Sequence, residues 1–457
     1  MTQYGVGARH GVPVSSFITL FTCCMVSLTL ASCAANTTAQ EPATPASTTA
    51  TSSVITQTAM PQPEAKPLAA SPSSAAPAPQ DFAAWLAGLK REAGGKGISK
   101  ATLDAAFANV NAPLPRVIEL DRSQPEFVQT FTGYMNARIN DARIKRGREL
   151  LAQNKELFQR IEKQYGVQPQ YLAAFWGLES NYGSITGGFS VINALATLAY
   201  DPRRSDFFRG ELFTALQILQ AGHIKPAEMT GSWAGAMGQC QFMPSTFRHY
   251  AVDADGDGRI DIWHSLPDVL SSAAHYLAES GWKGGERWGR EVVLPANFDF
   301  AFSGTTIRKT VSEWNTLGVR KADGTALGNG DLQASVVVPA GAKGPAFLVY
   351  DNFRTIMVWN RSVFYAISVG HLADRLMGDG PIRHMPAVEE RMLARADVEE
   401  LQTLLNAAGV DVGTPDGVLG SRTRDAVRTY QLKYKLVPDG YASYEFLEAL
   451  RGAAKTR

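Results

Sequence analysis

The sequence contains few cysteines. There are four among its 457 residues, and Cys23, Cys24 and Cys33 lie close to the N-terminus. The segment described below predicts cleavage directly before Cys33, which leaves Cys240 as the only other cysteine. An internal disulfide framework is therefore excluded, and the stability of an exported chain must come from a large apolar core.

The chain also lacks an excess of charge of either sign. Its formal net charge is +1 at pH 7. A nucleic-acid-binding protein typically has a strongly basic face, which this composition does not predict. We therefore expect no nucleic-acid partner.

One apolar stretch near the N-terminus predicts export. Arg9 and His10 precede residues 17–33, FITLFTCCMVSLTLASC. The stretch has about the length of a signal-peptide core and is shorter than most membrane spans.

The end of this stretch indicates where the mature chain is held. Leu30 to Cys33, LASC, resembles the lipobox of bacterial lipoproteins. The resemblance implies removal of residues 1–32 and lipidation of Cys33. Because Ala34 and not Asp follows, it also implies a periplasmic protein anchored to the outer membrane. The alternative is an ordinary signal peptide cut near the same point.

Large apolar residues are scarce from Ala34 to about Gln80, where Ala, Pro, Ser and Thr predominate. Such a composition cannot offset the entropy lost on ordering. We predict that residues 33–80 are a disordered tether, with a typical end-to-end distance of about 40 Å and a stretched limit of about 150 Å.

The rest of the chain has ordinary globular composition and the length of two or three domains. Asp81 is a candidate N-cap. From there to about Ala278, large apolar residues are spaced by three and four, which predicts helices. After Gly285, the β-branched and aromatic runs REVVLP, AFLVY, RTIMVWN and VFYAISV predict short strands. The expected fold is mainly α with a small β-containing part.

Glu179 occupies an unusual position in the sequence GLESNYG. Pro169 suits the first turn of a helix and Asn181 suits its end, so Glu179 falls in the last turn. Phe175 and Trp176, four and three residues earlier, share its face, so desolvation favours the protonated acid. An anionic side chain there also opposes the helix dipole. A lone Glu at a helix end is usually only solvated, but a partly protonated acid is what cleavage of a glycosidic bond requires.

Four motifs in order resemble the membrane-bound lytic murein transglycosylases of the B type, over residues 81–378. They are VIELDRSQPEF, GLESNYG, GSWAGAMGQCQFMPSTF and DADGDGRIDIWHSLPDVLSSAAHYL. The resemblance implies a lysozyme-like helical fold that cleaves the β-1,4 bond between N-acetylmuramic acid and N-acetylglucosamine. It also implies that Glu179 is the sole catalytic acid and base and that no cofactor takes part.

A single carboxylate suffices if the substrate supplies the nucleophile. Most retaining and inverting glycosidases need two carboxylates. In this family the muramyl C6 hydroxyl attacks instead of water, through an oxazolinium intermediate formed by the acetamido group, and leaves a 1,6-anhydromuramyl end. Peptidoglycan glycan strands are the implied substrate.

The resemblance also marks substrate-contact positions. The small residues of GSWAGAMGQCQFMPSTF let backbone approach a sugar, and Ser232 and Gln241 offer hydroxyl and amide groups. The full predicted set is Ser232, Gln241, Phe242, Met243, Tyr276, Tyr365 and Tyr134. The alternative is that Gln241 and the tyrosines are structural. The chain departs from the family pattern at His275, where Asn is frequent, and at Trp359, where Tyr is frequent, which puts subsite preference in doubt.

The segment DADGDGRIDIWH resembles a calcium loop. Asp253, Asp255 and Asp257 stand at positions 1, 3 and 5, and the carbonyl of Arg259 stands at position 7. Asp261 falls at position 9. Position 12 is His264 and not the usual Glu, so Asp268 is the family-matched carboxylate. We expect a structural Ca²⁺; the alternative is an Asx-rich turn held by its own hydrogen bonds.

Residues 379–397 are a predicted linker, and residues 398–453 resemble the type 1 peptidoglycan-binding domain. The motifs are DGVLGSRTRDAVRTYQ and VPDGYAS. The resemblance implies a three-helix module that raises the effective concentration of the enzyme on its polymer. We interpret the basic stretch NARINDARIKRGREL as a solvated helix face, and we expect a monomer.

Two alternative functions remain open from the sequence. A goose-type muramidase would use the same acid with water as the nucleophile. A non-catalytic wall-anchoring lipoprotein would bind glycan through both domains. The muramidase would give a different product, a reducing muramyl end. The wall-anchoring protein would be unaffected by replacement of Glu179.

Overall fold

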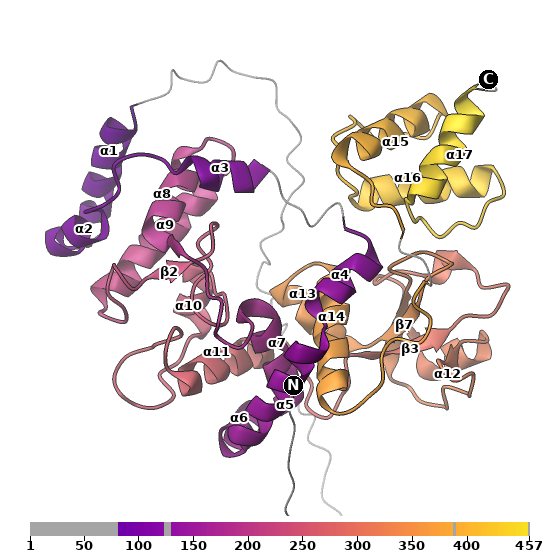
Figure 1. Cartoon of the computed structure of the whole chain (residues 1–457), viewed down its shortest axis with the longest axis horizontal. Helices are drawn as coiled ribbons and strands as arrows, with labels where there is room; N and C mark the ends of the chain where they lie inside the picture. The colour runs from indigo at the N-terminus through magenta and orange to yellow at the C-terminus, as the bar shows by residue number, and fades with distance from the viewer. Residues whose placement is uncertain (1–80, 123–128, 387–389, 456–457) are drawn as a thin grey trace, which may run out of the picture. The chain divides into compact units, whose positions relative to one another are not determined.

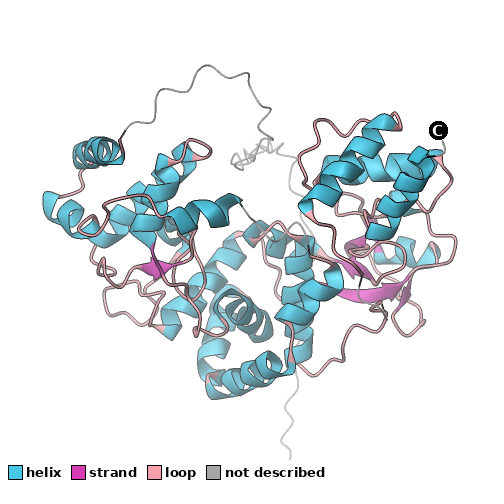
Figure 2. Cartoon of the chain, turned by 45° about the horizontal axis from the view of Figure 1, so that its top comes forward, coloured by secondary structure: helices cyan, strands magenta, loops and turns pink. Residues whose placement is uncertain are grey.

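The computed structural model describes residues 81–122, 129–386 and 390–455. The predicted signal peptide, Cys33 and the tether lie outside these residues, as does part of the VIELDRSQPEF motif. Helices dominate the described chain and strands form a small part of it, as Figure 2 shows, which confirms the expected fold class. Among the described residues, none of the helices combines the length and the apolar content needed to cross a bilayer.

One group of helices packs around the pair α8 and α9 (Figure 1). Its members are α1 (Phe82–Gly95), α2 (Lys100–Ala106), α3 (Pro115–Arg122), α8 (Val191–Tyr200), α9 (Ser205–Gln220) and α10 (Pro244–Tyr250). Asp81 occupies the N-cap position of α1, as predicted, but its side chain makes no capping hydrogen bond. Helix α8 is buried along nearly its whole length, which places it at the centre of this group.

A second group surrounds α7, which contacts α5, α6, α11 and α14. Its members are α4 (Phe131–Arg138), α5 (Asp141–Gln153), α6 (Lys155–Tyr165), α7 (Pro169–Ser180), α11 (Leu266–Glu279), α13 (Asp351–Trp359) and α14 (Val363–Leu376). Tyr171 to Gly177 are all buried, so α7 is the central helix of this group.

Two of the four predicted strand segments are strands. REVV lies in β3 (Gly289–Val293) and AFLV is β7 (Ala346–Val349). They join an antiparallel five-stranded sheet of order β4-β6-β7-β3-β5. Its other strands are β4 (Lys309–Thr310), β5 (Arg320–Lys321) and β6 (Gln333–Val337), and α12 (Val311–Thr316) follows β4 directly. The short strands β1 (Phe189–Ser190) and β2 (Thr230–Gly231) form a separate pair.

The strand prediction was wrong for RTIMVWN and VFYAISV, which lie in helices α13 and α14. Both segments are short apolar runs, and such a run in a packed helix cannot be told from a strand by its periodicity. The correction matters because these two helices carry Trp359 and Tyr365.

The C-terminal module consists of three helices, as predicted. They are α15 (Arg395–Ala407), α16 (Ser421–Lys433) and α17 (Tyr444–Lys455). The module has a hydrophobic core of its own, which includes Leu401, Leu405, Val427 and Leu447. The expected inward-facing residues of α16, Ala426, Val427 and Tyr430, are all buried.

Candidate active site

Glu179 lies in the last turn of α7, as the sequence predicts. Pro169 is in the first turn, and Asn181 ends the helix in the left-handed conformation with φ 49°. Tyr182 and Gly183 follow with φ 59° and 81°. Three consecutive residues with positive φ turn the chain sharply away from the helix axis, which leaves the Glu179 side chain at a helix end.

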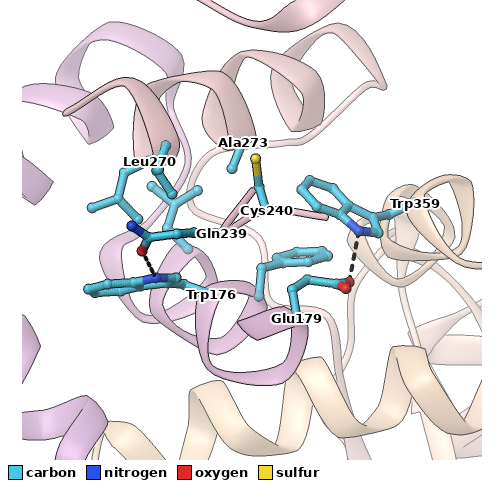
Figure 3. A pocket seen from close by; sticks show the side chains of 10 residues that line it. Trp176, Glu179, Gln239, Cys240, Leu270, Ala273 and Trp359 are labelled. Carbon is cyan, nitrogen blue, oxygen red and sulfur yellow. Dashed lines mark hydrogen bonds between the residues drawn. The ribbon is translucent and has the colours of Figure 1, made fainter. Parts of the chain in front are cut away.

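The carboxyl group of Glu179 borders a small pocket between α7, α11 and the end of α13 (Figure 3). Ten side chains line it: Leu172, Phe175, Trp176, Glu179, Gln239, Cys240, Val269, Leu270, Ala273 and Trp359. Within this lining Glu179 is the one acidic residue. The remainder is largely apolar, so the carboxyl group lies in a poorly hydrated environment.

Two hydrogen-bond donors converge on a single oxygen of Glu179. The indole Nε1–H of Trp359 donates to Oε1 over 2.9 Å, and the phenol O–H of Tyr365 donates to the same oxygen. Burial raises the pKa of Tyr365 well above its ordinary value, and the charge of Glu179 raises it further. Tyr365 therefore stays protonated and remains a donor.

The structure brings four of the predicted substrate residues to this end of α7. The rings of Phe242 and Tyr276 lie 5.4 Å and 5.0 Å from that of Trp359. Tyr365 contacts Glu179 directly, and the ring of Tyr134 lies 5.6 Å from that of Phe364, the residue before Tyr365. Aromatic side chains thus surround the carboxyl group on several sides.

Ser232, Gln241 and Met243 lie in the loop between β2 and α10, where their described contacts are mainly internal. The Ser232 hydroxyl accepts hydrogen bonds from the amides of Ala234 and Ala236 at 3.3 Å and 3.0 Å. The Gln241 amide nitrogen donates to the carbonyls of Thr186 and Gly238 at 3.0 Å and 2.8 Å. These side chains shape the loop, and their contact with substrate stays a prediction.

Sequence reasoning missed Gln239, which joins α7 to the acidic loop. Its Oε1 accepts the indole N–H of Trp176 over 2.8 Å, and its Nε2 donates to the carbonyl of Trp263 over 2.8 Å. A Cβ atom on Gly183 would approach Gln239 Oε1 to 2.2 Å. The amide therefore fills a tight space beside Gly183, and nothing in the sequence distinguishes it from its neighbours.

The interpretation of the basic stretch as a solvated helix face holds for Lys145, Arg146 and Arg148, which are exposed, but is wrong for Arg143. The half-buried Arg143 on α5 donates through Nε to Asn181 Oδ1 over 3.3 Å, and its carbonyl accepts the hydroxyl of Tyr182 over 3.0 Å. Burial lowers the pKa of Arg143. The side chain is within reach because α5 packs against α7, and it supports the turn that ends α7.

The acidic loop lies between α10 and α11. Carboxylate oxygens of Asp253, Asp255 and Asp268 all fall within 4.8 Å of one another. Asp257 instead pairs with Arg259 over 3.0 Å. Amides of the loop also donate to Asp253, as in an Asx-rich turn. An Asx-rich turn held by its own hydrogen bonds does not require three carboxylates to converge, as they do here.

Comparison with known families agrees with this architecture. The profile of the transglycosylase SLT domain matches residues 81–374. The chain belongs to this family. A second profile, that of a peptidoglycan binding domain, matches residues 394–450 of the transglycosylase.

Individual relatives are also lytic transglycosylases. The transglycosylase is 31% identical over 245 residues to membrane-bound lytic murein transglycosylase B of Escherichia coli, a match of 52% of this chain and 65% of that protein's length. It resembles SltB3 from Pseudomonas aeruginosa in complex with NAG-anhNAM-pentapeptide, with 45% identity, a TM-score of 0.78, and coverage of 81% of this chain and 100% of SltB3. Slt35 of E. coli in complex with calcium is 28% identical, with a TM-score of 0.55 and coverage of 65% and 93%.

Proposed function

We propose that this chain is a lytic transglycosylase that cleaves the β-1,4 bond between N-acetylmuramic acid and N-acetylglucosamine in peptidoglycan, with Glu179 as general acid and base. The observation that carries the proposal is the single carboxyl group in the pocket lining, at the end of a buried helix and held by Trp359 and Tyr365. The family membership supports it, as does the SltB3 complex with an anhydromuramyl ligand.

The proposed reaction returns the proton that it uses. Glu179 first gives its proton to the glycosidic oxygen, and the bond from that oxygen to the muramyl C1 breaks. The acetamido oxygen of the substrate attacks C1 and forms an oxazolinium ion. The Glu179 carboxylate then takes the proton of the C6 hydroxyl, whose oxygen attacks C1 and opens the oxazolinium ring. The product is a 1,6-anhydromuramyl end, and Glu179 is protonated again.

Mass spectrometry of muropeptides released from purified sacculi tests this function. We expect muramyl ends with the mass of the anhydro form, one water lighter than a reducing end. A run in H₂¹⁸O should leave these ends unlabelled, because no water enters the product. Reducing ends that carry ¹⁸O would identify a muramidase, and no release at all would favour a wall-anchoring protein.

The aromatic surroundings of Glu179 give the proposed sugar contacts. Tyr276 is the partly exposed ring of the set, and burial raises its pKa to about 12, so it meets a sugar as a neutral phenol. Phe242 and Tyr134 are buried and are proposed to back the groove. Ser232, Gln241 and Met243 are proposed to line the neighbouring part of the groove.

We also propose that Cys33 carries a lipid that anchors the enzyme to the outer membrane from the periplasmic side. The proposal rests on the LASC sequence. The E. coli relative is described as membrane-bound.

Replacing Cys33 with alanine should release the protein into the soluble periplasm, because the acceptor of the lipid is lost. Cleavage of sacculi by the purified protein should not change. Fractionation of cells followed by immunoblotting measures the distribution. The control is Cys24→Ala, which alters the leader and should leave the protein with the membranes. Continued sedimentation of the Cys33 variant with membranes argues against the anchor.

The acidic loop fits a calcium ion. Three carboxylates within 4.8 Å repel one another unless a cation lies among them. Burial of Asp268 raises its pKa, and the charge of Asp255 adds to that effect. Oxygen ligands of this kind suit Ca²⁺. We propose Asp253, Asp255, Asp268 and the Arg259 carbonyl as ligands, with Asp257 added on the basis of the loop spacing. The ion would stabilise the loop to which Gln239 is bonded.

Calcium at a hundredfold excess over its dissociation constant should stabilise the folded state by about 2.7 kcal/mol. Because position 12 of the loop is not Glu, we expect a dissociation constant of about 0.1 to 1 mM. A thermal melt with calcium and with chelator measures the shift, beside a turnover assay far below the melting temperature, in which chelation should leave most activity.

Asp255→Asn should abolish the rise in melting temperature, whereas Asp411→Asn, which alters an exposed aspartate paired with Arg422 in the C-terminal module, should not. The site is absent if millimolar calcium shifts nothing. Immediate loss of activity on chelation in the cold would instead give the ion a part in catalysis.

A further inference from the structure

Two arginines near the end of α7 have no part in the reaction proposed above. Arg138 is the last residue of α4, and Arg143 lies in the first turn of α5. Both side chains are partly exposed. Helix α4 packs against α14, and α5 packs against α7 (Figure 1). The two arginines therefore belong to the helix group that carries Glu179.

Arg138 covers an aromatic ring close to the carboxyl group. Its guanidinium carbon lies 3.7 Å from the centre of the Tyr134 ring. Burial raises the pKa of Tyr365, and the charge of Arg138 opposes that rise. Because Tyr365 donates a hydrogen bond to Glu179, Arg138 acts on the immediate surroundings of the proposed acid. A ligand that approaches the Tyr134 ring from this face meets the guanidinium first.

Arg143 adds a second positive charge beside Arg138. It donates through Nε to Asn181 Oδ1 over 3.3 Å and through a terminal nitrogen to the carbonyl of Arg138. Burial lowers the pKa of Arg143, and the charge of Arg138 adds to that effect. Across the described ranges, neither guanidinium forms an ion pair with a carboxylate. Two neighbouring cations repel each other, and an anion bound beside them offsets this repulsion.

Other cations of the basic stretch are engaged away from Glu179. Arg146 pairs with Glu149 over 3.5 Å. Arg148 donates to the carbonyls of Arg375 and Leu376 at the end of α14. The positive charge of Arg138 and Arg143 is thus the part of this stretch that lies near the turn ending α7 and has no protein carboxylate opposite it in the described chain.

We propose that Arg138, supported by the charge of Arg143, binds a carboxylate of the peptide stem carried by the muramyl residue at the bond that Glu179 cleaves. The inference rests on the proposed function. In an intact strand the lactyl carboxyl group is bonded to the stem, so the free carboxylates lie in the stem itself. The planar guanidinium fork matches a carboxylate through two parallel hydrogen bonds. The enzyme therefore prefers an acidic stem to a neutral one.

Two soluble glycan fragments that differ at one group of the stem test this preference. In the first, the α-carboxylate of the stem glutamate is free, and in the second it is an amide. The full-length enzyme should cleave the acid with a kcat/KM about tenfold higher than that of the amide, because a charge-assisted hydrogen bond is lost with the amide. The difference should appear mainly in KM and should shrink as salt is added.

Arg138→Gln should reduce the ratio of kcat/KM between acid and amide to about one. The ratio is independent of any general loss of activity, because one variant cleaves both fragments. Arg138→Lys keeps a positive charge at the end of α4, where it suits the helix dipole. It should retain only part of the ratio, because lysine lacks the planar fork.

Arg146→Gln is the matched control. It removes one positive charge from the same basic stretch, at an exposed position paired with Glu149, and should leave the ratio as in the wild type. Thermal melts establish that each variant is folded at the assay temperature.

A wild-type ratio near one would overturn the proposal. It is also wrong if Arg138→Gln keeps the wild-type ratio, or if Arg146→Gln abolishes it, since the effect would then come from the overall charge of the stretch. Failure of the proposed function is a separate outcome, because the wild-type enzyme would then leave no anhydro ends on either fragment.

Discussion

Glu179→Gln is expected to lower turnover by about two to four orders of magnitude, the usual contribution of general acid and base catalysis. The amide has the shape of the carboxyl group and still presents an oxygen to Trp359 and Tyr365. It cannot donate or recover the proton that the reaction needs. The melting temperature and binding to sacculi should stay close to those of the wild type.

No neighbour in the described pocket lining can replace this acid. Glu179 is the one acidic residue among the ten, and burial raises the pKa of the Cys240 thiol far above the range of the assay. Rates on soluble glycan fragments, together with a thermal melt, measure the effect.

Glu211→Gln is the control for loss of a buried carboxylate. Glu211 lies on α9 and accepts hydrogen bonds from the amide and the hydroxyl of Ser245 at 2.9 Å and 2.6 Å. It belongs to the helix group around α8 and α9, so its replacement can lower stability but should leave turnover below the melting temperature unchanged. If Glu179→Gln retains most of its activity, another group is the acid.

The position of Glu179 could be predicted because its determinants are local. Pro169, Asn181 and Gly183 lie within one short stretch and fix both ends of α7, and Phe175 and Trp176 share the face of Glu179 through helical spacing alone. The family motifs then added the chemistry. The end of a helix and the residues on one of its faces require no knowledge of tertiary contacts.

The partners of Glu179 could not be predicted in the same way. Trp359 and Tyr365 are 180 and 186 residues distant in sequence. The runs that contain them resemble strands, because a short apolar run in a packed helix does not reveal its helical periodicity. Gln239 and Trp176 are 63 residues apart, and their hydrogen bond depends on how a loop packs against α7.

The second large effect concerns two glutamines that make similar hydrogen bonds in different domains, the partly buried Gln239 and the buried Gln402. Gln239 ties α7 to the acidic loop through Trp176 and Trp263. Gln402 on α15 accepts hydrogen bonds from the amides of Asp416 and Gly417 at 2.8 Å and 2.9 Å and donates to Thr423 over 3.1 Å. Each amide satisfies backbone or indole groups that water reaches poorly, so its loss leaves them without partners.

Gln239→Ala should destabilise the catalytic domain by about 2 to 4 kcal/mol, from the lost hydrogen bonds and the cavity beside Gly183. The melting temperature should fall by about 5 to 15 °C. Because the last turn of α7 loses a support, kcat on short soluble glycans should also fall below the melting temperature. Binding to sacculi through the C-terminal module should persist.

Gln402→Ala should give the opposite pattern. The module is small and has little stability to lose, so the same change should unfold it at a much lower temperature. Sacculus binding should weaken, while cleavage of short soluble glycans should match that of the wild type. Thermal melts, in which each domain gives its own transition, measure the stability of the two domains. Pull-down with sacculi measures wall binding, and rates on soluble fragments measure cleavage. If both variants lose binding and cleavage equally, the two domains do not have separate roles. Each glutamine would then stabilise the whole protein and not only the domain that contains it.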